Sequence, residues 1–274
     1  MSDTGTLEGR KQLVAIALDV AREAGKLVEA GWRRGVVADH KGPVDLVTRF
    51  DRESEMLLRD ALHARTKLPV IGEEDGADEA AADGVPTWFV DPIDGTTNFV
   101  HGHFFYCVSV GLAVDGEALL GAVVAPSLHT EWTGVVGVGD APGVVLRNDA
   151  PGRVSGVERF LDALLATGFP YDRRHTADNN FDAFVAIKKQ CQAVRRCGSA
   201  ALDLCLVADG TYDGYWEKGL RPWDIAAGSA IVRAAGGQIS HYDASDADVR
   251  TGEIIATNGK IHTALVDALA RASV

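Results

Sequence analysis

Two aspartates that are three residues apart follow an apolar stretch of the chain, in the segment WFVDPIDGTTNFVHG at residues 88–102. Pro92 prevents a helix from starting before it, and the glycine after the second aspartate permits a sharp turn. One short loop can therefore direct the carboxylates of Asp91 and Asp94 and the carbonyl oxygen of Ile93 towards a common point. Oxygen ligands of this kind suit hard cations, Mg²⁺ above all.

The next residues, Gly95 and Thr96, offer backbone N–H groups that can form an anion-binding nest beside the carboxylates. A plainer interpretation is an acidic turn that caps a helix. An acidic pocket next to an anion nest can hold a phosphate only if metal ions bridge the two, which is the logic of a two-metal phosphoester hydrolase. The chain has no G-x-x-x-x-G-K motif and no G-x-S-x-G or Cys/His pattern, so neither a kinase loop nor a covalent nucleophile is indicated.

Three more acidic segments could join this loop. Glu73 and Glu74 follow a short apolar strand in IGEED, Asp224 opens an amphipathic helix in RPWDIAAG, and Asp51 lies at a helix start in DLVTRFDRESE. Each has a plain alternative, a solvated loop for the glutamates and a helix cap for the aspartates. If all of them converge, their mutual repulsion requires cations to neutralise them.

Composition limits the possible partners. The chain has 274 residues, of which 46% are hydrophobic and 24% charged, and its formal net charge is −12. This charge argues against a duplex nucleic acid and against an anionic membrane surface. The polar N-terminus shows no secretory signal, and no apolar stretch approaches the roughly 20 residues that span a bilayer. None of the four cysteines sits in a C-x-x-C pair, so we expect no zinc site and reduced, mostly buried thiols in a cytoplasmic protein.

Periodicity predicts the elements that must position these residues. In the first half we expect helices over 13–29 and 48–65, strands over 68–71, 87–91 and 129–138, and a hairpin around Asp115-Gly116. The second helix should turn four apolar residues inward: Met56, Leu57, Ala61 and Leu62. Residues 75–86 read as an acidic loop, and residues 139–153, rich in Gly, Pro and Asp, as a passage between halves.

The second half alternates helices and strands. We expect helices near 157–166, 178–190, 199–208 and 224–235, a last helix from Asn258, and strands over 191–197, 211–219, 238–241 and 253–257. Mixed sheets layered with helices are the natural solution, in two packed halves of about 10–145 and 146–270.

In GEE, WFVDPIDGTTNFVHG and PWDIAAG the chain resembles the inositol monophosphatase family, which comprises Mg²⁺-dependent, lithium-sensitive phosphatases related to fructose-1,6-bisphosphatase. The resemblance runs from about residue 10 to 270. It implies an α+β fold of the layered α-β-α-β-α type, a single domain over residues 1–274, and a homodimer. The family often has an N-G turn before a strand in mid-chain, whereas residues 143–149 here read GVVLRND, which puts that loop in doubt.

The resemblance also implies roles for residues. The ligands of two or three Mg²⁺ ions would be Glu73, Asp91, the carbonyl of Ile93, Asp94 and Asp224. The catalytic group that positions and deprotonates a water molecule would be Glu73, Thr96 and Asp51. The groups that contact phosphate and the hydroxyls of the substrate would be Gly95, Thr96, Gly198, Ser199, Ala200 and Glu217.

The implied activity is hydrolysis of a phosphate monoester, with inositol 1-phosphate as the leading substrate. Relatives with the same motif act on histidinol phosphate, fructose 1,6-bisphosphate or 3′-phosphoadenosine 5′-phosphate. Glu217 favours a polyol because a carboxylate can accept hydrogen bonds from two neighbouring hydroxyls; otherwise it is a surface charge. A second hypothesis is a regulatory, protein-binding role on the same fold, because bacterial relatives are implicated in binding transcription machinery. A small phosphate monoester remains the expected partner, with no nucleic acid and no membrane.

Overall fold

A computed structural model describes residues 3–34, 38–40, 46–74 and 82–272 of the chain. The elements of the first half are α1 (Leu7–Gly31), β1 (Ala38–His40), β2 (Leu46–Thr48), α2 (Arg49–Thr66), β3 (Val70–Gly72), β4 (Thr87–Asp94), α3 (Thr96–Val100), β5 (Cys107–Val114), β6 (Glu117–Ala125), the 3₁₀ turn η1 (Pro126–Leu128), β7 (Thr130–Val135), β8 (Val144–Arg147) and β9 (Ala150–Pro151). Strands β3 to β9 form a seven-stranded sheet in sequence order, and β1 and β2 pair separately.

The second half contains η2 (Phe160–Asp162), β10 (Leu164–Thr167), α4 (Phe181–Lys188), β11 (Ala193–Arg195), α5 (Ala200–Ala208), β12 (Gly214–Lys218), α6 (Pro222–Ala234), β13 (Gln238–Ser240), β14 (Glu253–Thr257) and α7 (His262–Ala272). Its five strands form a mixed sheet in the order β11-β10-β12-β14-β13.

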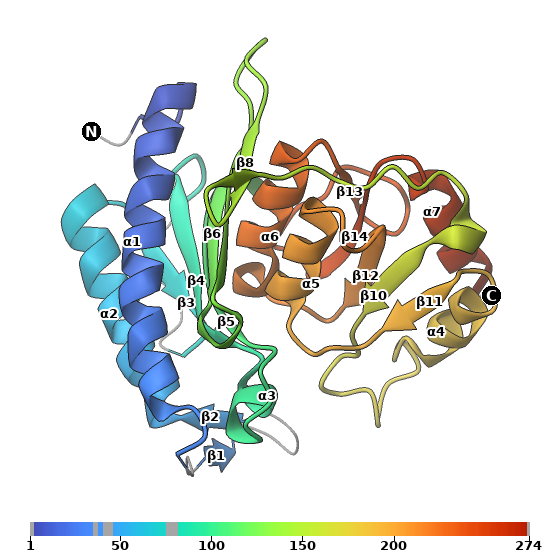
Figure 1. Cartoon of the computed structure of the whole chain (residues 1–274), viewed down its shortest axis with the longest axis horizontal. Helices are drawn as coiled ribbons and strands as arrows, with labels where there is room; N and C mark the ends of the chain where they lie inside the picture. The colour runs from blue at the N-terminus through green and yellow to red at the C-terminus, as the bar shows by residue number, and fades with distance from the viewer. Residues whose placement is uncertain (1–2, 35–37, 41–45, 75–81, 273–274) are drawn as a thin grey trace.

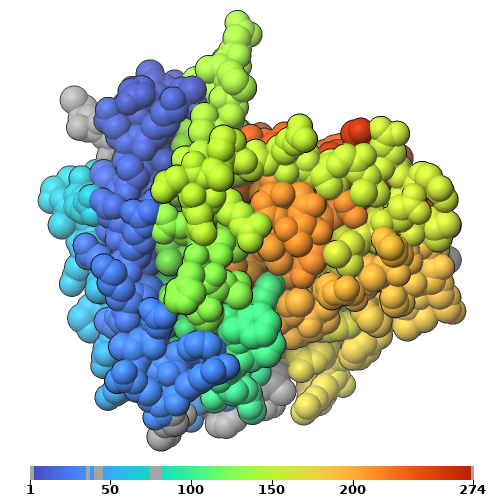
Figure 2. Space-filling model, in the orientation of Figure 1, coloured from blue at the N-terminus to red at the C-terminus, as the bar shows by residue number. Residues whose placement is uncertain are grey.

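The two sheets and the helices form five layers, which Figure 1 shows nearly edge-on. Helices α1 and α2 cover the outer face of the seven-stranded sheet, α5 and α6 lie between the sheets, and α4 and α7 cover the outer face of the five-stranded sheet. This arrangement confirms the predicted α-β-α-β-α fold. In Figure 2 the blue-to-green first half and the yellow-to-red second half touch along the face in view.

The outer helices follow their apolar periodicity, with one exception. Helix α2 starts where Thr48 accepts a hydrogen bond from Phe50 N, and its buried stripe includes Leu58 and Leu62. The prediction that Met56 faces inward is wrong, because its side chain is 58% exposed. The inward position next to it is taken by Glu55, which is fully buried. The buried face of α2 therefore mixes apolar residues with polar ones, among them Asp51, Ser54 and Glu55, and this shifts it from the predicted stripe.

A row of glycines lets α6 approach the seven-stranded sheet at backbone distance. Gly111, Gly121 and Gly134 lie directly opposite one another on β5, β6 and β7. A Cβ atom at Gly121 would lie 2.6 Å from Cα of Ala227, and one at Gly134 would lie 2.5 Å from Cα of Ile231. Only glycine leaves room for a helix backbone here. The row therefore fixes the height of α6 over the sheet and, with it, the position of the helix N-terminus.

Several predicted boundaries differ from the structure. Residues 157–166 form no helix; they contain the short turn η2 and the strand β10, because the segment carries Leu164 and Leu165 into the second sheet. Residues 139–153 are more than a passage, since β8 and β9 extend the first sheet. Their turn uses Asn148 and Asp149, both with positive φ, where a glycine would be usual. The last helix starts at His262 and not at Asn258.

The other predicted elements of the described chain are present, including the hairpin at Asp115-Gly116, where both residues have positive φ. Residues 75–81 of the predicted acidic loop lie outside the described residues. The four cysteines are free thiols, three of them buried. In the part of the chain that the structure describes, no helix is both long enough and apolar enough to cross a membrane.

That residues 1–274 form a single domain stays a prediction. One continuous apolar cluster between the two sheets supports it, because Phe89 and Cys107 of the first half pack in the same cluster as Leu204, Tyr215 and Ile225 of the second.

The glycine row makes a prediction about stability. Gly121→Ala should lower the free energy of unfolding by about 1–3 kcal/mol, because the added methyl group must push α6 off the sheet. Gly156→Ala is the matched control, since no heavy atom lies within 4 Å of its added Cβ. Urea unfolding followed by tryptophan fluorescence measures both variants. Equal midpoints for the two would show that α6 does not depend on this row.

Candidate active site

The register of two parallel strands places Glu73 beside Asp91. Strand β3 pairs with β4 so that Gly72 lies opposite Val90, and the two acidic residues follow directly. Because side chains alternate along a strand, Asp91 points to the same side as Phe89, towards the apolar cluster that contains α6. Asp91 is buried, and its Oδ1 accepts a hydrogen bond of 2.9 Å from Ile93 N.

Strand β4 does not end at Asp91, as the sequence suggested, but continues to Asp94 through a shift in register against β5. Pro92 is tolerated because the ladder is interrupted at this point. Asp94 is buried at the end of the strand. Its Oδ2 accepts hydrogen bonds of 2.7 Å from Ser199 Oγ and from Ala201 N, at the N-terminus of α5.

Asp51 of α2 and Thr96 of α3 come together although they lie 45 residues apart in the chain. Asp51 is the third residue of α2, and its Oδ2 accepts hydrogen bonds from Thr48 N at 2.7 Å and from the Thr48 hydroxyl at 2.6 Å. The other oxygen, Oδ1, lies 3.3 Å from the Thr96 hydroxyl, which also lies 3.0 Å from the Ile93 carbonyl oxygen. The cap that the sequence offered as an alternative is real, and it uses only one of the two carboxylate oxygens.

Asp224 is likewise both a cap and a member of the site. It is the third residue of α6, and its Oδ2 accepts a hydrogen bond of 2.6 Å from Arg221 N. The carbonyl of Trp223 is 3.4 Å from the hydroxyl of Ser109, which lies opposite Asp91 on β5. The first turn of α6 therefore sits over the strand that carries Asp91.

Five of these carboxylates influence one another electrostatically; we call Asp51, Glu73, Asp91, Asp94 and Asp224 the acidic cluster. Burial raises the pKa of Asp91 well above its usual range, and the charges of the other four members raise it further. The pKa of Asp224 is also well raised, first by burial and then by Asp94. Burial raises the pKa of Asp94 to about 6, although its hydrogen bond from Ser199 opposes the shift.

The donor set fits hard divalent cations. Every member of the acidic cluster supplies oxygen, and mutual repulsion in a buried place calls for positive charge. Among residues 3–34, 38–40, 46–74 and 82–272, no three Asp, Glu, His or Cys side chains already form a ligand cage. This agrees with the hydrogen bonds above, because three of the carboxylates each direct one oxygen to a backbone or hydroxyl donor.

The predicted phosphate segment and the predicted hydroxyl-contacting segment are neighbours. Gly95 has a φ of 96°, and a Cβ on it would lie 3.2 Å from the carbonyl oxygen of Gly198. The amide of Asn98 donates to the carbonyls of Phe105 at 2.7 Å and Cys197 at 2.8 Å, so it ties the two halves together at this point.

The segment after Cys197 lies at the start of α5. Gly198 has a φ of 87°, Ser199 is the N-cap, and Ala200 is the first helical residue, so the segment lies at a helix N-terminus as predicted and the helix starts one residue later than expected. The Ser199 hydroxyl donates to Asp94, so in this structure it positions the acidic cluster.

Glu217 is not a surface charge, so that alternative is wrong. Its side chain is buried on β12, and the Tyr215 hydroxyl donates a hydrogen bond to Oε2. Burial raises its pKa to about 7, against the lowering effects of that hydrogen bond and of Arg196. A Cβ on Gly168 would collide with the carboxylate, so Gly168 makes the room that Glu217 occupies.

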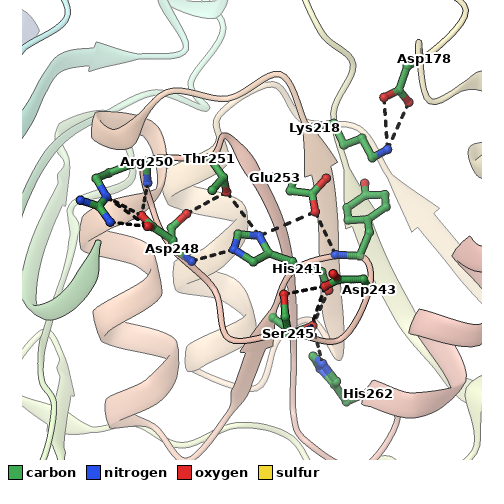
Figure 3. A network of polar contacts seen from close by, with 12 residues as sticks. Asp178, Lys218, His241, Asp243, Ser245, Asp248, Arg250, Thr251, Glu253 and His262 are labelled. Carbon is green, nitrogen blue, oxygen red and sulfur yellow. Dashed lines mark hydrogen bonds and ion pairs between the residues drawn. The ribbon is translucent and has the colours of Figure 1, made fainter. Parts of the chain in front are cut away.

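A polar network at one end of the five-stranded sheet includes Lys218, the residue that follows Glu217 in the chain (Figure 3). His241 accepts a hydrogen bond of 3.0 Å from Asp248 N, and its ring lies 3.7 Å from the carboxylate of Glu253. Glu253 on β14 lies opposite Lys218 in the strand register of β12 and β14. Lys218 in turn forms an ion pair of 3.2 Å with Asp178. The loop between β13 and β14 is thereby tied to the strand that carries Glu217.

Sequence reasoning missed several residues that support the site. Asn98 joins the two halves, Glu55 is buried beneath the turn that carries Glu73, and Asp203 is a buried carboxylate whose Oδ1 has no hydrogen-bond partner. One signal was available for Glu55, since it lies four residues after Asp51 and therefore on the same, inward face of α2. The partners of Asn98 lie 7 and 99 residues away, and no local pattern marks them.

Comparison with known proteins shows what kind of protein this fold and this acidic cluster define: a phosphoric monoester hydrolase. The sequence model of the Inositol monophosphatase family matches residues 10–273, and the chain belongs to this family. The family is generally metal-dependent, in keeping with the oxygen ligands described above.

Relatives and solved structures agree over most of the chain. An inositol-1-monophosphatase of Synechocystis sp. is 41% identical, covering 93% of this chain and 88% of the relative. Nus factor SuhB of Pseudomonas aeruginosa is 37% identical, covering 93% and 94% of the two chains. The structure of inositol monophosphatase from Anabaena (Nostoc) sp. superposes with a TM-score of 0.85 at 36% identity, covering 95% and 96%.

The raised pKa of Asp94 predicts how stability depends on pH when metal ions are removed. An acid whose pKa is raised in the folded state stabilises the fold fully below its unfolded pKa, 3.8 here, and this contribution is lost as the pH rises through about 6. In EDTA, the free energy of unfolding should therefore fall between pH 4 and pH 7. Asp94→Asn should remove part of that fall, up to about 3 kcal/mol.

Asp140→Asn, in an exposed loop, is the control for this measurement. Urea denaturation at a series of pH values gives the slopes. If Asp94→Asn keeps the wild-type slope, Asp94 does not share in the repulsion that we assign to the acidic cluster.

Proposed function

We propose that this protein hydrolyses inositol monophosphate to inositol and phosphate, with two or three Mg²⁺ ions as cofactors. The observation that carries the proposal is the burial of Asp91 among Glu73, Asp94, Asp224 and Asp51, whose charges all raise its pKa. These carboxylates can all stay ionised together only with counter-charge, and a phosphate can join them only through cations. The identity of 41% to an inositol-1-monophosphatase supports the choice of substrate.

The ions would be held by Glu73, Asp91, the Ile93 carbonyl, Asp94 and Asp224. When bound, they supply a water molecule of lowered pKa and neutralise charge on the phosphoryl and leaving oxygens. The hydrogen bonds to Asp91, Asp94 and Asp224 each hold one carboxylate oxygen, so the protein restrains each of these side chains.

The Thr96 hydroxyl is the group that we assign to accept a proton from the attacking water, while its own proton moves towards Asp51 Oδ1. The contacts of 3.3 Å to Asp51 and 3.0 Å to the Ile93 carbonyl support this assignment, because they fix the position of the hydroxyl. Asp51 is fully buried and its second oxygen is held by Thr48, so the carboxylate is oriented before substrate binds.

On the other side of the site, the backbone amides of Gly95 and Thr96 would contact phosphate oxygens. The segment of Gly198, Ser199 and Ala200 would contact the hydroxyls through its backbone. Glu217 would accept hydrogen bonds from two neighbouring hydroxyls when it is ionised. Because its pKa is about 7, both the ionised and the protonated form are populated near neutral pH.

Finer properties follow from the same proposal. We expect inhibition by millimolar Li⁺, because Li⁺ is close to Mg²⁺ in size but carries half its charge, so it would not stabilise the leaving oxygen.

We also expect a cytoplasmic homodimer. Phe181 and Val185, which lie four residues apart on α4, are both exposed and support an interface between protein chains.

A second function is favoured by one observation, the 37% identity to Nus factor SuhB. The chain could bind a protein of the transcription machinery through its surface, independently of hydrolysis. Co-purification with RNA polymerase from cells that carry wild-type protein or Asp94→Asn separates the two functions. Equal recovery of polymerase with both proteins would support a binding role that needs no turnover, and no recovery with either would rule it out.

The proposed activity is tested by phosphate release from inositol 1-phosphate, histidinol phosphate, fructose 1,6-bisphosphate and 3′-phosphoadenosine 5′-phosphate, in Mg²⁺ and in EDTA. We expect the highest kcat/KM for inositol 1-phosphate, loss of activity in EDTA and with Asp94→Asn, and inhibition by Li⁺. A higher kcat/KM for another substrate would move the assignment to that phosphatase, and full activity in EDTA would exclude the metal mechanism.

Glu217 should determine the substrate and not the chemistry. Glu217→Gln removes a charged acceptor for two hydroxyls, each bond being worth about 1.5–3 kcal/mol. It should lower kcat/KM for inositol 1-phosphate about tenfold or more, with little change for p-nitrophenyl phosphate, which has no neighbouring hydroxyls. Glu117→Gln, on an exposed strand end, is the control. Equal losses on both substrates would place Glu217 in the chemistry of phosphoryl transfer.

A further inference from the structure

A buried ion pair lies beneath the turn that carries Glu73. The Glu55 side chain is completely buried on α2, and its Oε1 accepts a hydrogen bond of 3.0 Å from Arg59 Nε, one helical turn later. Its Oε2 accepts a hydrogen bond of 2.7 Å from Glu74 N. The carboxylate thus connects α2 to the turn after β3.

The same pair also holds the strand before that turn. Arg59 Nη1 donates a hydrogen bond of 3.1 Å to the Val70 carbonyl. A Cβ atom on Gly72 would lie 2.6 Å from Glu55 Oε2, so the carboxylate rests directly against the glycine backbone. Glu55 and Arg59 therefore contact the chain both before and after Gly72, at which the pairing of β3 with β4 ends.

The hydrogen bond to Glu74 N bears on Glu73 because a peptide group is planar. The N–H of Glu74 belongs to the plane that also contains the Cα and the carbonyl group of Glu73. Holding that N–H fixes the plane, while the pairing of Gly72 with Val90 fixes the chain on the other side of Glu73. The backbone of Glu73 is thereby held from both sides.

We propose that the pair Glu55–Arg59 is a positioning device that sets the affinity of the site for its divalent cation by fixing Glu73. This inference rests on the proposed function, in which Glu73 is a ligand. Groups that orient a ligand typically alter metal affinity by 10–100-fold when removed. Arg59 forms an ion pair with Glu55, so we expect this buried carboxylate to hold the turn of Glu73 and not to compete with Glu73 for the cation.

Glu55→Gln tests the proposal, because the amide can accept only one of the two hydrogen bonds and turns an NH₂ group towards the other donor. Glu53→Gln, an exposed position two residues earlier on the same helix, is the matched control. Mg²⁺ is titrated by calorimetry into each protein after EDTA treatment, without substrate. We expect the dissociation constant of Glu55→Gln to rise about tenfold and that of Glu53→Gln to stay within about twofold of wild type.

Enzyme kinetics give a second measurement, which would not change if the Glu55–Arg59 pair only stabilised the fold. The Mg²⁺ concentration for half-maximal phosphate release should rise about tenfold in Glu55→Gln, while kcat at saturating Mg²⁺ falls less than about threefold. A folded Glu55→Gln protein that has lost stability but binds Mg²⁺ like wild type would overturn the inference alone. Wild-type protein that neither binds Mg²⁺ nor needs it for hydrolysis would overturn the proposed function, and the inference with it.

Arg59→Lys keeps the test decisive if Glu55→Gln does not fold. Lysine retains the charge but cannot reach Glu55 and the Val70 carbonyl with the geometry of a guanidinium. Circular dichroism shows whether the variant is folded, and we expect weaker Mg²⁺ binding by about threefold or more. A folded Arg59→Lys protein with wild-type affinity for Mg²⁺ would overturn the inference.

Discussion

Repulsion between buried carboxylates is the constraint on which the rest of this structure depends. Each aspartate of the acidic cluster that is held by a helix lies at an N-terminus: Asp51 in the first turn of α2, Asp94 against the first amides of α5, and Asp224 in the first turn of α6. The positive end of a helix and its unpaired N–H groups favour negative charge. The N-termini of three helices from two halves of the chain therefore have to meet at the acidic cluster. The arrangement in five layers is one fold that makes this possible.

The layers meet this requirement through close backbone packing. The glycine row on β5, β6 and β7 lets α6 lie directly on the first sheet, and Gly228 lets α5 pack closely on α6, because a Cβ atom there would lie 2.5 Å from Leu204 Cβ. The helix that contributes Asp224 is consequently one of the most enclosed in the molecule. A site that concentrates like charge loses stability locally, and the extensive burial of α5 and α6 compensates for that loss.

Much of this could be predicted where the determining interactions are local. The cap at Thr48, the hairpin at Asp115-Gly116 and the helix that begins near Asp224 all follow from residues within a few positions of one another. The acidic residues of the site could be named because their types and spacing limit the chemistry.

What the sequence could not show depends on distant partners. Residues 157–166 look helical alone but become a strand through pairing with β12. The inward position of Glu55 makes sense only with the backbone of Gly72 and Glu74 against it, and the hydrogen bond from Ser199 to Asp94 joins residues 105 positions apart.

The side chain of Asn98 has a further consequence, because its single amide group joins the carbonyls of Phe105 and Cys197 from different halves. The candidate active site is thus also the joint of the molecule, and fluctuations that part the halves are the same fluctuations that disassemble the site.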